Sequence, residues 1–185
     1  MTRSAQAFAA AKVNLDLRIL SRRADGYHEL ESLVVFADVG DRVGVTPSDT
    51  FKLTVEGRAA SELDGPNLLA DAAQALMSRI PGLNPGHVTL DKVLPVGAGL
   101  GGGSADVAAF LRIMRGLVPD LARDLDLDAL ALSLGADVPV CLAGKPSWMR
   151  GIGERVEPLK GCIPQIPSVL EPGHPNLHAK CVSSA

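Results

Sequence analysis

A run of glycines between two regular segments constrains the fold of this chain more than any other feature. Five glycines fall within the seven residues from Gly97 to Gly103. Alternation predicts a strand over residues 87–94 before the run, and a helix is predicted over residues 105–117 after it, opened by Ser104. Glycines let backbone N–H groups approach an anion closely, and the free N–H groups of a helix start favour phosphate. The run therefore indicates a phosphate-binding loop; the alternative is a flexible turn with a glycine-rich helix cap.

This glycine run fits neither of the two common nucleotide-binding motifs. Residues 97–102 match the G-x-G-x-x-G dinucleotide pattern, but Pro95 interrupts the preceding strand and no strand-end acidic residue follows about 20 residues later. A P-loop needs Gly-Lys followed by Ser or Thr, whereas residues 144–146 read Gly-Lys-Pro. We therefore expect a phosphate site outside both of those folds.

The rest of the chain predicts an α+β fold. Apolar residues make up 46% of the 185 residues and aromatic residues only 3%, so aliphatic side chains must fill a sizeable core. In the first strand Val13, Leu15, Leu17 and Ile19 share one face, and Asn67 is expected to cap the first helix. The order of elements predicts a two-layer unit with a mixed or largely antiparallel sheet and helices on one face. The expected strands cover residues 9–19, 33–37, 41–45, 51–55 and 87–94, and the expected helices cover 68–80, 105–117 and 127–134.

Charge and cysteine content exclude several classes of protein. The formal net charge of −3 argues against a general binder of nucleic acid or of anionic membranes. No apolar run approaches the ~20 residues of a membrane span, and residues 1–11 do not resemble a signal peptide. Three widely spaced cysteines fit free thiols in a reducing cytoplasm better than a disulfide scaffold.

Three further stretches carry residues suited to chemistry. Lys12, followed by Asn14, stands at the start of the first strand, and Asp137 lies between a predicted helix and an apolar stretch expected to be a strand. Tyr27 and His28 follow a polar turn and offer a stacking ring beside a hydrogen-bonding ring. Taken singly, these would be a solvated lysine, a capping aspartate and loop-end rings. Beside a phosphate loop they suit phosphoryl transfer to an alcohol, which needs a carboxylate for the hydroxyl proton and a cation near the phosphate.

Four stretches together resemble a known family. Residues 10–15, 22–28, 94–104 and 134–140 are similar, in order, to motifs of the 4-diphosphocytidyl-2-C-methyl-D-erythritol kinase family of the GHMP small-molecule kinase superfamily, which acts in the non-mevalonate isoprenoid pathway. The resemblance covers residues 7–159. It implies a GHMP-kinase amino-terminal domain, a two-layer sandwich like domain 2 of ribosomal protein S5. It also implies ATP-dependent phosphorylation of the 2-hydroxyl of the cytidyl substrate.

The resemblance also implies catalytic roles and cofactors. Asp137 matches the catalytic base that takes the proton from the substrate 2-hydroxyl, and Lys12 matches its partner lysine. ATP and Mg²⁺ are the implied cofactors, with Ser104 near the phosphates and Mg²⁺, and no separate metal site is expected. The implied ATP loop comprises Pro95, Val96, Gly97, Ala98, Gly99, Leu100, Gly101, Gly102, Gly103, Ser104 and Ala105.

The implied partner is the small cytidyl substrate. Tyr27 and His28 match residues that hold the cytosine ring, and Asn14 is expected to line the same floor. Neither nucleic acid nor membrane is an expected partner, and the oligomeric state is left open.

Residues 160–185 differ in character from the rest. Four prolines and no sustained period of 2 or 3.6 predict an irregular tail, whereas family members continue into a second domain that is missing here. Residues 171–182 can be written in codons that, read one base later, give the family-like phrase Asn-Pro-Gly-Ile-Pro-Ile-Ser-Thr-Pro. We therefore interpret residues 1–159 as the ATP-binding and catalytic domain and residues 160–185 as an out-of-frame tail.

These interpretations predict a kinase of the named family whose activity is impaired in this chain. One alternative is an inactive nucleotide-binding fragment. Another is a different GHMP kinase acting on homoserine, mevalonate or a sugar. The Tyr27–His28 pair favours the cytidyl substrate over this last alternative.

Overall fold

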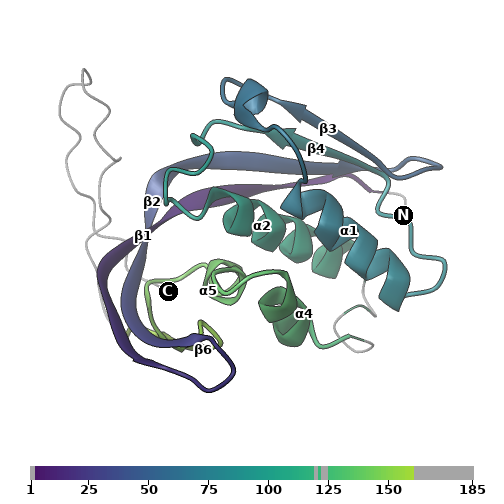
Figure 1. The fold of residues 1–185 in the computed structure, drawn as a ribbon. Helices are drawn as coiled ribbons and strands as arrows, with labels where there is room; N and C mark the ends of the chain where they lie inside the picture. Colours follow the sequence, from purple (N-terminus) through teal and green to yellow (C-terminus); the bar gives the residue numbers. More distant parts are fainter. Residues whose placement is uncertain (1–2, 119–120, 122–124, 161–185) are drawn as a thin grey trace.

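A curved sheet covered on one face by helices forms the molecule (Figure 1). The computed structural model describes residues 3–118, 121 and 125–160. The sheet contains β1 (Ala5–Arg22), β2 (His28–Thr46), β3 (Lys52–Glu56), β4 (His87–Asp91), β5 (Ser147–Gly151) and β6 (Arg155–Pro158). Its helices, in the part of the chain described, are α1 (Leu68–Arg79), α2 (Gly102–Leu117), α4 (Leu127–Leu134) and α5 (Val138–Ala143), with a 3₁₀ turn at Ala60–Glu62. The predicted α+β two-layer architecture is confirmed.

The long strand β2 organises the sheet. It is antiparallel to β1 on one side, and on its other side it is antiparallel to β5 in its first part and to β4 in its last part. β3 adds to β4 in parallel, and β6 adds to β5 antiparallel. The sheet is therefore mixed but largely antiparallel, as predicted.

Several element bounds differ from the sequence-based expectation. The segments predicted over 33–37 and 41–45 are parts of one strand, β2. Gly40 lies between them and lets β1 pass close to the backbone of β2. A Cβ at this position would lie only 2.2 Å from the carbonyl oxygen of Ala9. The strand predicted over 87–94 ends at residue 91. The second predicted helix starts at Gly102, so Ser104 is its third residue and does not open it.

The segment after Asp137 is also corrected, because it forms the short helix α5 and no strand. Pro139 sits in the first turn of α5, where its missing N–H costs nothing. Gly144, with φ +60°, ends the helix in the left-handed conformation. Apolar composition alone does not distinguish a buried short helix from a buried strand.

Helix α2 forms the centre of the core. Phe110, Leu111 and Met114 are fully buried on it, and they belong to one apolar cluster with Val43 and Leu90 of the sheet. The cluster also includes buried residues of α1, whose first turn is capped by Asn67, as predicted. Since both layers contribute to this cluster, α2 and the sheet hold the segments between them in fixed positions.

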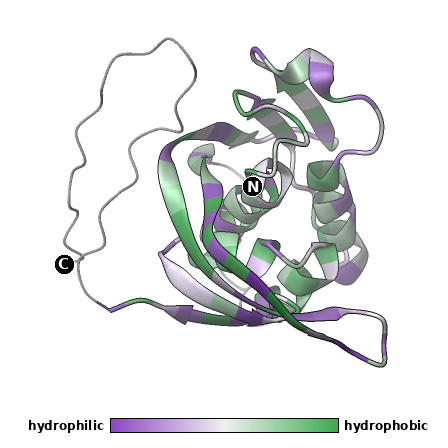
Figure 2. Ribbon diagram, turned by 60° about the vertical axis from the view of Figure 1, so that its left-hand side comes forward, coloured by the Kyte–Doolittle hydropathy of each residue, from purple (hydrophilic) through white to green (hydrophobic). Residues whose placement is uncertain are grey.

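The apolar face predicted for the first strand does not belong to the core. Leu15, Leu17 and Ile19 are 50%, 53% and 67% exposed, although the alternation that predicted a strand is correct. β1 shifts register against β2 at three places, two of which flank this stretch. Apolar and polar residues alternate along the β1–β2 ribbon (Figure 2). This part of the hairpin therefore projects beyond the helix layer.

No helix among the described residues is long and apolar enough to cross a membrane. The predicted tail, apart from Lys160, lies outside the described residues.

Candidate active site around the glycine loop

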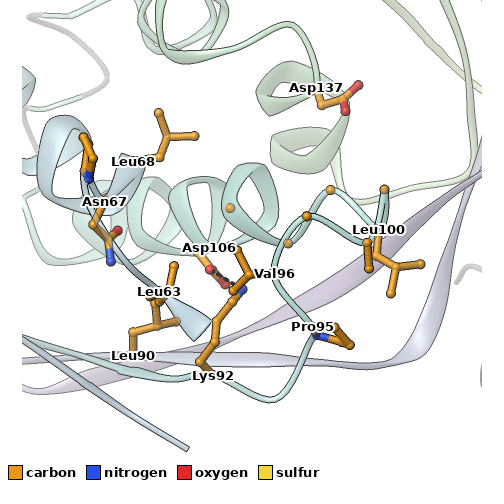
Figure 3. A pocket seen from close by; sticks show the side chains of 17 residues that line it. Leu63, Asn67, Leu68, Leu90, Lys92, Pro95, Val96, Leu100, Asp106 and Asp137 are labelled. Atoms are coloured by element: carbon orange, nitrogen blue, oxygen red, sulfur yellow. Dashed lines mark hydrogen bonds and ion pairs between the residues drawn. The ribbon is translucent and has the colours of Figure 1, made fainter. Parts of the chain in front are cut away.

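The glycine loop forms one wall of a cavity of about 420 Å³. The loop runs from the end of β4 to the start of α2, and its residues from Pro95 to Gly103 line the cavity. Asp137 lies across the cavity from Lys92 and Asp106 (Figure 3). Apolar side chains, among them Leu63 and Leu68, form another wall. The cavity thus has a polar part at the glycines and an apolar part next to α1.

The loop adopts a backbone conformation that requires glycine at alternate positions. Gly97, Gly99 and Gly101 have φ values of +72°, +73° and +62°, which L-residues with a side chain rarely adopt. The far end of the loop is tied to the sheet, because the backbone N–H of Lys12 donates to the carbonyl of Leu100 at 2.8 Å. The glycines therefore let the loop fold against the first strand. This supports the phosphate-loop interpretation over that of a flexible turn.

Lys12 and Asp137, which are 125 positions apart in the sequence, form an ion pair in the structure. The Lys12 Nζ lies 3.0 Å from Asp137 Oδ2, and the Lys12 side chain is 2% exposed. Asp137 is the N-cap residue of α5, but its carboxylate makes no capping hydrogen bond and is 35% exposed at the cavity. The carboxylate is therefore available both to the lysine and to the cavity.

Asn14 belongs to the same group of residues. Its Oδ1 accepts hydrogen bonds from Lys12 Nζ at 3.2 Å and from Ser32 Oγ at 3.0 Å. Because an ammonium can only donate, Oδ1 must face Lys12 and the amide nitrogen must face away. The structure thus brings Asn14, Lys12 and Asp137 together, and the catalytic roles expected of Lys12 and Asp137 stay a prediction.

A second charged cluster lies at the other end of the loop, and the sequence reasoning missed it. Lys92 Nζ donates to Asp41 Oδ2 at 2.6 Å and to Asp106 Oδ2 at 2.9 Å, and all three side chains are at most 4% exposed. Asp106 Oδ1 is buried and has no hydrogen-bond partner. A signal in the sequence could have indicated the cluster. Asp41 and Asp106 each stand within an apolar segment, and Lys92 comes shortly before the loop.

The cluster changes the acidity of its members. Burial, together with the nearby Asp41 carboxylate, raises the pKa of Asp106 to about 7, although Lys92 acts in the opposite direction. Burial alone would lower the pKa of Lys92, but the two carboxylates outweigh burial and raise it. Lys92 therefore stays an ammonium, held by its carboxylate neighbours.

Tyr27 and His28 lie elsewhere, at the turn between β1 and β2. Tyr27 is 61% exposed, and neither residue lines the cavity. The turn is fixed locally: the Tyr27 N–H donates to Asp25 Oδ1 at 3.1 Å, and the Arg23 N–H donates to the Tyr27 carbonyl at 2.8 Å. The structure therefore does not join the predicted cytosine-binding pair to the catalytic pair within one pocket.

Ser104 lies close to Gly135, two residues before Asp137 in the chain. It lies in the first turn of α2, and its Oγ is 4.0 Å from the point where a Cβ on Gly135 would stand. It is not among the residues that line the cavity. Among the described residues, no group of three or more His, Cys, Asp or Glu side chains is arranged to hold a metal ion.

Comparison with known proteins assigns the class of this domain. Residues 67–145, which include the glycine loop and Asp137, match the family described as GHMP kinases N terminal domain. The chain therefore contains the amino-terminal domain of a GHMP kinase.

Within that class, two curated relatives carry the same name. A 4-diphosphocytidyl-2-C-methyl-D-erythritol kinase of Bradyrhizobium sp. (strain ORS 278) is 46% identical over 172 residues, which cover 92% of this chain and 57% of the relative. The enzyme of that name from Rhodopseudomonas palustris (strain ATCC BAA-98 / CGA009) is 48% identical over 164 residues, covering 88% of this chain and 54% of the relative. The chain is similar to these kinases over most of its own length, and it spans about half the length of the curated relatives it matches.

A solved structure supports the same assignment. The crystal structure of a 4-(cytidine 5'-diphospho)-2C-methyl-D-erythritol kinase matches with a TM-score of 0.68 and 41% identity, covering 86% of this chain and 57% of that chain. The fold and the family resemblance expected from the sequence are thus confirmed.

The loop geometry predicts opposite effects of alanine at two neighbouring glycines. Gly101→Ala should lower the free energy of unfolding by about 1–3 kcal/mol, because φ is +62° and the new Cβ would lie 3.0 Å from Lys12 Cε. Gly103→Ala should be neutral or raise it by up to about 1 kcal/mol, because Gly103 is helical and the nearest atom, Leu68 Cδ2, is 3.9 Å away. Urea unfolding of both variants measures this, and equal losses would contradict the loop geometry.

Proposed function

We propose that this chain carries the ATP-binding and catalytic part of a 4-diphosphocytidyl-2-C-methyl-D-erythritol kinase, which phosphorylates the 2-hydroxyl of its substrate. The observation that carries the proposal is the Lys12–Asp137 pair, at 3.0 Å, beside a glycine-loop cavity. The names of the similar proteins supply the substrate. Since the chain spans about half of their length, the activity of the whole protein is part of this proposal.

In the proposed reaction, Asp137 is the general base. Its carboxylate is partly exposed at the cavity, so a substrate hydroxyl can reach it and donate its proton. Lys12 is buried behind it and makes a charge-assisted bond that fixes the carboxylate in one orientation. The ammonium also offsets negative charge as the phosphoryl group moves from ATP to the alcohol.

The two parts of the cavity suit the two parts of ATP. The backbone N–H groups of the loop and of the first turn of α2 would bind the phosphates, since they are the free donors of a helix start. The apolar wall with Leu63 and Leu68 would hold the base. In this arrangement the terminal phosphate would face Asp137 across the cavity.

Mg²⁺ is part of the proposal as the companion of ATP. The ion neutralises phosphate charge, and it is bound mainly by phosphate oxygens with one or two oxygen ligands from the protein. The Ser104 hydroxyl, a hard oxygen donor in the first turn of α2, fits such a role. Its Oγ lies close to Gly135, two residues before Asp137 in the chain.

Tyr27 and His28 are proposed to hold the cytosine ring. Asn14 is proposed to donate a hydrogen bond to the substrate between that ring and Asp137. The exposed Tyr27 ring offers a free face for stacking. The amide nitrogen of Asn14 faces away from Lys12 and can donate to a substrate oxygen.

We propose the cytoplasm as the place of action, and the small-molecule substrate as the partner.

The function is tested by ATP binding and by phosphoryl transfer. Calorimetry with the 185-residue chain measures ATP affinity directly. Transfer to the cytidyl substrate, followed by ³¹P NMR, is measured on a chimera that joins residues 1–159 to the remaining part of the Bradyrhizobium relative. Absence of ATP binding by the chain together with absence of transfer by the chimera would contradict the proposal.

Asp137→Ala should abolish nearly all turnover of this chimera. General-base catalysis contributes about 10²–10⁴-fold, so kcat should fall at least by that factor, whereas the Kd for ATP should stay within about threefold. Asp38→Ala, at an exposed aspartate on β2, is the matched control and should leave kcat unchanged. If Asp137→Ala kept near-normal kcat, the carboxylate would be no more than part of the α5 turn.

Tyr27→Ala should raise the KM for the cytidyl substrate and leave the KM for ATP unchanged. A stacked base is worth about 1–3 kcal/mol, which corresponds to roughly 5–150-fold. Tyr27→Phe keeps the ring and should keep most of the affinity. An unchanged substrate KM in Tyr27→Ala would remove the hairpin turn from the substrate site.

A further inference from the structure

The loop is held at its two ends by the buried Asp41–Lys92–Asp106 cluster. Asp41 Oδ1 accepts hydrogen bonds from the backbone N–H groups of Val93 at 2.6 Å and Leu94 at 2.8 Å. These are the two residues that lead the chain from β4 into the glycine loop. Asp41, which is 0% exposed on β2, therefore fixes the direction in which the loop begins.

The same aspartate reaches the far end of the loop through Lys92. Asp41 Oδ2 accepts from Lys92 Nζ, and that ammonium also donates to Asp106 Oδ2 on α2. A Cβ on Gly102, the first residue of α2, would lie 2.9 Å from Lys92 Nζ, so the ammonium sits directly under the loop's last turn. One buried chain of hydrogen bonds thus connects β2, the start of the loop and the helix that receives it.

We propose that Asp41 is a positioning residue for nucleotide binding: through Val93, Leu94 and Lys92 it sets the distance between the two ends of the glycine loop. The inference rests on the proposed function in taking this loop as the nucleotide phosphate site. A loop of five glycines has few side chains of its own to fix its shape, so its backbone donors point at phosphate only when its ends are held. Asp41 itself does not line the cavity.

The cluster offers two isosteric variants that separate positioning from charge. All affinities are measured well above the pKa of Asp106, which is about 7, so that Asp41→Asn and Asp106→Asn each remove one negative charge beside the cavity. In Asp41→Asn, either orientation of the amide turns its NH₂ group toward a donor, the Lys92 ammonium or the two backbone N–H groups. In Asp106→Asn, the amide oxygen still accepts from Lys92, because the other carboxylate oxygen has no partner to lose.

Affinity for ATP and for inorganic triphosphate is measured by calorimetry on the 185-residue chain and both variants, below their unfolding temperatures. Asp41→Asn should weaken binding of both ligands at least tenfold, whereas Asp106→Asn should stay within about threefold of the parent chain. An unchanged affinity in Asp41→Asn, or an equal loss in both variants, would overturn the proposal. A loss confined to ATP would place the effect at the base, and would overturn it as well.

Amide hydrogen exchange gives a readout that does not depend on ligand. In Asp41→Asn the amides of Val93 and Leu94 should exchange at least tenfold faster than in the parent chain, while those of the α2 core, such as Phe110, should not. A purely structural role would instead raise exchange throughout. If the parent chain bound neither ligand and the chimera transferred no phosphate, the proposed function would fail, and loop exchange would still decide the role of Asp41.

A second variant serves if Asp41→Asn does not fold. Lys92→Met combined with Asp106→Asn keeps the net charge of the cluster and the bonds from Asp41 to the loop start, but it cuts the link to α2. The same tenfold loss of triphosphate affinity is expected. Full affinity in this double variant would show that the ends of the loop need no such connection. Leu76→Ala, in the core of α1, is the control for a general loss of stability and should leave the affinity unchanged.

Discussion

The site depends on one buried charge, the ammonium of Lys12, and on what neutralises it. Moving an ammonium out of water costs several kcal/mol unless a partner and hydrogen bonds compensate. Here the partner, Asp137, belongs to α5, and the further acceptor, Asn14, belongs to β1. Because the lysine has to meet its carboxylate, the start of α5 is held against the sheet. The same contact places a partly exposed carboxylate at the cavity, where a substrate can reach it.

The glycine loop lies between this pair and the second buried cluster around Lys92. At one end the backbone of Lys12 binds the loop at Leu100, and at the other end Asp41 binds it at Val93 and Leu94. The two lysines have different surroundings. Lys12 has a carboxylate partner that is 35% exposed at the cavity, whereas Lys92 lies between two carboxylates that are at most 4% exposed. This difference is the physical reason for giving the first lysine a role in chemistry and the second a role in positioning.

Much of this arrangement could be predicted from the sequence, because local patterns determine it. Asn67 before an apolar helical period, five glycines before a helix, and alternation along the first strand each act over a few residues. What could not be predicted depends on contacts between distant segments. The apolar segment of α5 has no period that separates helix from strand, and the exposure of Leu15 follows from the position of β1 at the sheet edge. Likewise Asp41 and Asp106 are 65 positions apart, and only the packing of α2 on β2 shows that they share one lysine.

The two proposed subsites differ in how completely the described residues form them. The proposed phosphate cavity is lined by the loop, by Asn67 and Leu68 at the start of α1, and by Asp137. Tyr27 and His28, in contrast, are exposed at the hairpin turn and lie outside this cavity. An exposed ring that stacks on one face of a base contributes only about 1–3 kcal/mol, which by itself corresponds to binding weaker than millimolar. Specific capture of a cytidyl group therefore needs contacts in addition to these two rings, whereas binding of a triphosphate can be tested on the residues described here.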